Sequence, residues 1–223
     1  MAIFNVICFS GEFSLVLICL IGDYYIFESK LVIDLLKKIL FFKENLLRAL
    51  MDNASHGLIG LISWLVVSYP NTDIYELIAS GAIASFIDLD HFISARSLYL
   101  SDATSLSTRP FLHNSLTMII LNVIIYAGLS VFYPEKRYWA VLFFVSWFSH
   151  HVRDANRRGL WFGPIYTTSP LKKPVYFGLI ALAPLALRFF YNDTKNLFDF
   201  RSNLLGMIRQ KNESLVRRYI HIV

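Results

Sequence analysis

The chain has 223 residues, of which 56% are hydrophobic and 17% are charged, and its mean hydropathy is +0.51. Soluble domains carry about 45–50% apolar and about 25% charged residues, so this composition excludes an ordinary soluble protein and indicates a multi-pass membrane protein. The net charge of +5 fits loops that face anionic lipid. Basic and aromatic residues do not alternate as they do in nucleic-acid-binding proteins, so no nucleic-acid partner is expected.

The first apolar run covers residues 3–27 and is interrupted by Glu12 and Asp23. No basic residue precedes it and no small-residue cleavage site stands out, so we expect a retained first span. Residues 30–50 then alternate Lys, Arg and acids with Leu and Ile at helical spacing. This pattern predicts an amphipathic helix that lies in the membrane interface, with a solvated helical arm as the alternative.

Five further apolar runs follow, at residues 54–69, 74–92, 113–133, 138–152 and 175–191. Together with the first they predict an all-α transmembrane bundle of about six spans. We expect residues 1–191 to form this bundle and residues 192–223 a polar tail with a short surface helix. Tryptophans near the run ends are expected to anchor in the interface; they are Trp64, Trp139, Trp147 and Trp161.

The fifth run ends in two histidines, His150 and His151, followed closely by Asp154. On a helix, His150 and Asp154 are four residues apart and lie on one face. Imidazole and carboxylate on one helical face can present a metal site, as in metal-binding helical bundles. A local hydrogen bond between the two side chains would explain the same spacing, so the other histidines decide between these interpretations.

Successive spans alternate in direction, and this places most ionisable residues at one end of the bundle, here named side X. The second span starts there with His56, the third returns there, the fourth starts there with His113, and the fifth returns there. The opposite turns at residues 69–71 and 133–135 carry no histidine. The expected cluster on side X consists of Asp23, His56, Asp88, Asp90, His91, His113, His150, His151 and Asp154, with Asp23 in a structural role.

We expect the metal ligands to come from this cluster. The candidate ligands are His56, Asp88, His91, His113, His150 and Asp154. Asp88 and Asp90 point about 200° apart on an ideal helix, so both reach one centre only if the helix ends there; otherwise Asp90 orients a histidine. Nitrogen and oxygen ligands without sulfur suit Zn²⁺, Mn²⁺ or Fe²⁺, and we favour Zn²⁺ or Mn²⁺.

Such a metal would supply a water nucleophile for hydrolysis. Arginines of side X could hold an anionic substrate such as a lipid phosphate head group; they are Arg109, Arg153, Arg157 and Arg158. We expect Asp90, Arg109 and Arg153 to act in catalysis. Two hypotheses remain open: a metal-dependent hydrolase that acts on a lipid phosphoester, and a non-catalytic scaffold whose polar cluster caps helices. The arginines could equally follow the positive-inside bias.

Several short motifs resemble the eukaryotic transmembrane protein 267 family. They are Asp52-Asn53 with His56, Ile87-Asp88-Leu89-Asp90-His91-Phe92, Arg109-Pro110-Phe111-Leu112-His113, Ser146-Trp147 with His150-His151 and Arg153-Asp154, Gly159-Leu160-Trp161, and Thr168-Ser169-Pro170. The resemblance covers residues 10–185. More distantly the chain is similar to bacterial LexA-regulated inner-membrane proteins regarded as metal-dependent hydrolases, which implies that chemistry here. Their pattern matches Asp88, Asp90, His91, Arg109, His113, Ser115, His150 and Asp154.

The chain departs from the bacterial pattern at two places. Thr108 stands where that pattern has a second histidine, and Asn114 follows His113, so that Ser115 comes one position late. Basic residues are concentrated in the loops of side X, while the short opposite turns hold Lys136 and Arg137. This bias places side X in the cytosol, although the basic tail then faces the other way. We expect an endomembrane location, in the endoplasmic reticulum or Golgi.

Overall fold

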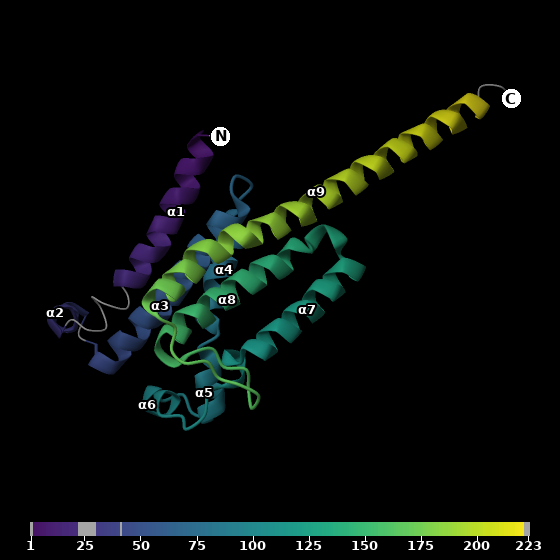
Figure 1. The fold of residues 1–223 in the computed structure, drawn as a ribbon. Coiled ribbons are helices and arrows are strands. Elements are labelled where there is room, and N and C mark those ends of the chain that lie inside the picture. Colours follow the sequence, from purple (N-terminus) through teal and green to yellow (C-terminus); the bar gives the residue numbers. More distant parts are fainter. Residues whose placement is uncertain (1, 22–29, 41, 221–223) are drawn as a thin grey trace.

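The computed structural model describes residues 2–21, 30–40 and 42–220. Asp23 and His221 lie outside these ranges. The described chain is a bundle of helices (Figure 1). In chain order they are α1 (Ala2–Leu20), α2 (Lys30–Leu40), α3 (Glu44–Ser68), α4 (Ile74–Phe86), α5 (Leu89–Ala95), α6 (Leu100–Thr104), η2 (Phe111–His113), α7 (Ser115–Phe132), η3 (Pro134–Lys136), α8 (Tyr138–Arg158) and α9 (Lys173–Ile220).

Among the described residues, four helical stretches are long and apolar enough to cross a membrane: α3, α4 with α5, α7, and α9 up to Thr194. The α8 helix packs against α3, α4, α7 and α9, and α1 packs against α3 and α9. Together with α1 and α8, these four stretches correspond to the six apolar runs of the sequence. The prediction of an all-α membrane bundle is confirmed.

The α3 and α4 helices approach closely because small residues meet where they cross. A Cβ atom on Gly60 would lie 2.6 Å from the Cβ of Ala84, and one on Gly57 would lie 2.6 Å from the Oγ of Ser85. Ser80 Oγ donates to the Gly60 carbonyl at 2.8 Å and lies 2.7 Å from Ser146 Oγ of α8. Close backbones and interhelical hydrogen bonds hold membrane helices together, and here they fix α4 between α3 and α8.

The structure differs from the sequence expectations at two helix ends and at two tryptophans. The segment 30–50 is not one helix, because α2 ends at Leu40 and residues 44–50 are the first turns of α3. The α9 helix continues unbroken past residue 191 to Ile220, extending beyond the bundle (Figure 1), so the division of the chain at that residue stays a prediction. Trp64 and Trp147 are buried and donate hydrogen bonds to Glu76 and the Leu112 carbonyl, so they are not interface anchors.

At side X, the α4–α5 junction, α6, η2 and the loop after α8 lie together at one end of the bundle (Figure 1). The loop is fastened to the start of α7 by the Ser115 amide, which donates to the Trp161 carbonyl at 2.7 Å. Gly159 begins this loop with φ +73°, and a Cβ there would lie 2.0 Å from the Thr168 carbonyl oxygen. Only glycine fits this turn, which returns the chain over the end of α8.

Candidate metal centre

Three parts of the chain bring the predicted ligands together at side X. The break between α4 and α5 carries Asp88, η2 ends in His113, and α8 contributes His150 and Asp154 one turn apart. The helix breaks here, since α4 ends at Phe86 and α5 begins at Leu89, but only Asp88 reaches the centre and Asp90 orients a histidine. Both acids lie against the same imidazole, that of His113, at opposite ring nitrogens.

Four side-chain atoms, named here the inner set, converge on one point: His113 Nε2, His150 Nε2, Asp88 Oδ1 and Asp154 Oδ2. His113 Nε2 lies 3.2 Å from His150 Nε2, 3.3 Å from the Asp88 oxygen and 3.4 Å from the Asp154 oxygen. His150 Nε2 lies 3.6 Å from each of the same two oxygens. Ligand bonds of about 2.0–2.2 Å to a tetrahedral Zn²⁺ place ligand atoms about 3.3–3.6 Å apart. The donor set and its spacing therefore fit such an ion.

The remaining ring nitrogens fix which way both histidines point. His150 Nδ1 donates to the Ala84 carbonyl of α4 at 2.8 Å, and His113 Nδ1 donates to the Asp90 carboxylate at 3.2 Å. Asp90 is fully buried and also accepts from the Leu112 amide at 2.8 Å. Partners of this kind set the tautomer of metal-binding histidines, so both Nε2 lone pairs face the centre.

This arrangement favours a positive charge at the centre. Burial of the ring lowers the pKa of His113, but hydrogen bonds to the Asp154, Asp88 and Asp90 carboxylates raise it more, to about 11. Two imidazole lone pairs and two carboxylate oxygens at such short distances repel one another unless a cation lies between them. A proton or a divalent metal ion can supply that charge.

His56 and His91 lie outside the inner set. The His56 ring stacks on His150 with centroids 3.8 Å apart, and its Nε2 lies 3.5 Å from the other Asp154 oxygen. His91 Nδ1 lies 3.3 Å from Asp90 Oδ1 and 3.8 Å from Asp88 Oδ1. Each histidine can join a group of three donors, His56 with His150 and Asp154, and His91 with Asp88 and His113, so both could complete a larger coordination shell.

Arg153 is fully buried and faces away from open space. Its guanidinium donates to Asp52 and to His56 Nε2, the latter at 3.1 Å. Arg157 donates to the same Asp52 and to Asp154 Oδ1 at 2.9 Å. This ion network holds His56 and Asp154 in place, which favours a positioning role for Arg153 over contact with a substrate.

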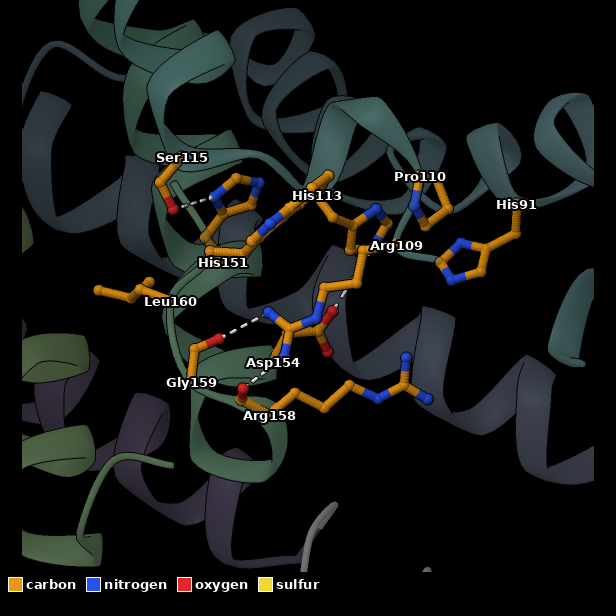
Figure 2. Close-up of a pocket in the computed structure, with 11 residues that line it drawn as sticks. His91, Arg109, Pro110, His113, Ser115, His151, Asp154, Arg158, Gly159 and Leu160 are labelled. Carbon is orange, nitrogen blue, oxygen red and sulfur yellow. Dashed lines mark hydrogen bonds and ion pairs between the residues drawn. The ribbon is translucent and has the colours of Figure 1, made fainter. Parts of the chain in front are cut away.

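A small pocket opens beside the inner set (Figure 2), and we name it the arginine pocket. Its lining includes His91, Arg109, His113, Ser115, Asp154 and Arg158. Arg109 donates to the Gly159 carbonyl at 2.9 Å and to that of Arg158. A guanidinium has five N–H donors, so others remain for an anion. The predicted anion-binding arginines are thus divided: Arg109 and Arg158 line the pocket, while Arg153 does not.

The role of His151 was not predicted from the sequence, where its spacing to Asp154 was the only pattern that singled it out. Trp147 Nε1 donates both to the Leu112 carbonyl at 2.8 Å and to His151 Nε2 at 3.0 Å, and His151 Nε2 itself lies 2.8 Å from the same carbonyl oxygen. The other ring nitrogen, His151 Nδ1, forms a hydrogen bond with the Ser115 hydroxyl at 3.2 Å (Figure 2). His151 therefore orients Ser115 at the wall of the arginine pocket and is not part of the inner set.

Residues 51–208 match the family of the YdjM inner membrane protein, a segment that contains every residue of the inner set. This chain belongs to the YdjM family. It is also 41% identical over 151 residues to transmembrane protein 267 of Mus musculus, covering 66% of this chain and 70% of the relative. For the Bos taurus protein the identity is 43% over 143 residues, with 62% and 66% covered.

Transmembrane protein 267 of Xenopus laevis is 39% identical over 159 residues, covering 69% of this chain and 74% of the relative. No solved structure matches the chain significantly. The resemblance that the motifs indicate is confirmed for both groups of relatives. This YdjM-family chain is an integral membrane protein, as the names of its relatives and its apolar helices agree.

Proposed function

We propose that this YdjM-family protein is a metal-dependent hydrolase that acts on a phosphoester of a membrane lipid at side X. One observation carries the proposal: the Nε2 lone pairs of His113 and His150 face each other at 3.2 Å between two carboxylates. We expect Zn²⁺ or Mn²⁺ there. The bound ion would act as a Lewis acid on a phosphoryl oxygen and supply a water nucleophile at neutral pH.

The chain's own residues supply orientation and charge. Asp90 and the Ala84 carbonyl hold the two imidazoles in their ligating tautomers. Arg109 and Arg158 line the adjoining pocket and would bind the phosphate oxygens, because guanidinium groups match phosphate geometry. Arg153 supports the site through Asp52 and His56. An anionic lipid head group is the partner that this charge pattern favours.

Metal analysis of the purified protein in detergent tests the proposal. We expect about one metal ion per chain in the wild type and its loss in His150→Ala, because one of four ligands is removed. Glu76→Gln is the control, since Glu76 is a buried acid on α4 that the structure places with Trp64 and not with the inner set. A wild type without stoichiometric metal would refute the hydrolase.

Turnover is measured separately, as inorganic phosphate released from a phosphomonoester lipid in mixed micelles, with and without added Zn²⁺ or Mn²⁺. The second candidate is a non-catalytic scaffold, which the buried Asp52–Arg153–His56 network favours. In that case His150→Ala lowers thermal stability, and neither protein shows metal-dependent phosphate release.

The cellular location belongs to the same proposal: an endoplasmic reticulum or Golgi membrane with side X in the cytosol. The concentration of basic residues in the side X loops supports this orientation. A cysteine placed at Ser105, an exposed residue of the side X loop, reports it in a background without Cys8 and Cys19. Labelling from the cytosolic side agrees with the proposal, and labelling from the lumen alone contradicts it.

A further inference from the structure

A second and larger opening adjoins the inner set, between the first turns of α3 and the α5–α6 pair; we name it the α3–α6 groove. It has a volume of about 450 Å³, within the range of about 300–1,000 Å³ that single small-molecule ligands occupy. The arginine pocket is far smaller, at about 20 Å³. The groove is therefore the place near the inner set with room for the bulk of a ligand.

Each of the groove's helices contributes apolar side chains to its walls. The α3 helix contributes Leu46 and Leu50, which lie one turn apart on one face and are 39% and 46% exposed. Phe92 of α5 and Leu100 and Ala103 of α6 face the same space. Since Leu47 on another face of α3 is buried, the exposed pair is not explained by packing within the bundle. Such walls suit a hydrocarbon chain.

The polar lining of the groove leads to the inner set. Asp88, a member of that set, and His91 both line the groove, together with Asp52 and Asn53 of α3. His91 also lines the arginine pocket, so the groove and the arginine pocket meet at the same residue. An occupant with one anionic and one apolar end can reach from Arg109 past the inner set into the groove.

We propose that the α3–α6 groove binds the hydrocarbon chain of the amphiphile whose phosphoester is held at the inner set. The identity of the ligand as a substrate rests on the proposed function, but binding of its hydrocarbon chain in the groove can be measured without any turnover. The substrate class is then a long-chain phosphoester, with its phosphate between Arg109, Arg158 and the inner set and its chain against Leu46, Leu50 and Phe92. Short phosphate esters that lack the chain bind weakly.

The test uses a long-chain alkyl phosphate with a photoactivatable diazirine near the end of its chain. It is photolysed with the full-length protein in nanodiscs, and labelled peptides are identified by mass spectrometry. We expect label in residues 45–53 and 92–104. Leu50→Trp fills the groove and should reduce this label about tenfold, the scale on which apolar pockets discriminate chain size. Leu58→Trp is the matched control, since Leu58 is 49% exposed on the same helix and does not line the groove.

The two proposals fail in different ways. Groove labelling that Leu50→Trp removes and Leu58→Trp retains supports the groove assignment even if no phosphate is released, in which case only the hydrolase fails. Label spread over lipid-facing α7, or equal label in both tryptophan variants, overturns the groove assignment even if the protein hydrolyses phosphoesters. A long-chain alcohol with the same diazirine should label the groove less than the phosphate does; equal labelling would also contradict the proposal.

Discussion

Each end of the bundle holds carboxylates among polar partners, but the kind of partner differs between the two ends. At the end opposite side X, Glu76 accepts from Trp64 Nε1 at 3.2 Å and interacts with the Tyr138 hydroxyl. At side X, Asp88 and Asp154 face imidazole nitrogens whose lone pairs converge. Neutral N–H and O–H donors satisfy Glu76, whereas Asp88 and Asp154 lie beside further acceptors, the imidazole nitrogens. The convergence of further acceptors, which Glu76 lacks, is the feature that supports the proposed metal site.

We expect the largest effect, a loss of metal affinity at side X, from Asp90→Asn. The substitution keeps size but removes the charge that holds the Nδ1 proton of His113, so the ring loses its ligating orientation. Loss of the hydrogen-bond partner of a metal-binding histidine reduces metal affinity by about 10–100-fold. Competition with a chromogenic chelator measures the affinity. Unchanged metal affinity in Asp90→Asn would mean that Asp90 does not orient His113.

Glu76→Ala tests the end of the bundle opposite side X. It leaves the buried Trp64 N–H without its acceptor, and an unsatisfied buried donor costs about 1–3 kcal/mol of stability. Thermal unfolding in detergent should show the lowered midpoint, while metal content stays at the wild-type value. Glu76→Gln, which keeps an acceptor oxygen, should lose less stability. Loss of metal in Glu76→Ala with the fold intact would show that the two ends are not independent.

A third variant perturbs the helix crossing that supports side X, and of the two that should weaken metal binding it has the smaller expected effect. Gly60→Ala forces a methyl group against Ala84, whose carbonyl holds His150, and overpacking of this kind costs about 1–3 kcal/mol. Metal affinity should fall slightly with it. Gly128→Ala on α7 is the control, because open space surrounds that position, and it should raise stability by up to about 1 kcal/mol. Equal behaviour of both variants would contradict the role of the crossing.

Much of the fold and part of the site follow from the sequence. Alternation of spans predicts the clustering of His56, Asp88, His113 and Asp154 at one end, because span direction needs only the apolar runs. Which donors form the inner set cannot be predicted this way. That outcome depends on the break after Phe86, which lets Asp88 and Asp90 reach opposite sides of one ring, and on the Ala84 carbonyl that orients His150.

The early start of α3 and the continuation of α9 past residue 191 share a physical cause. Polar residues at 43–50 and beyond 191 interrupt the apolar runs, but the backbone hydrogen bonds of α3 and α9 continue through them, since helix continuation does not require apolar side chains. Likewise, Trp147 is buried because its N–H finds the Leu112 carbonyl. The burial of Arg153 depends on Asp52, a partner 101 residues away, and no local pattern reveals that pairing.

The inner set draws its four atoms from the α4–α5 break, η2 and α8, and no two neighbouring helices hold it alone. If the inner set binds an ion as we propose, the chain cannot bind it during synthesis until α8 has been made, which requires most of the protein to have been translated. Ion binding would then follow assembly of the bundle. A chain truncated before Asp154 lacks one of the four ligands and should not retain the ion.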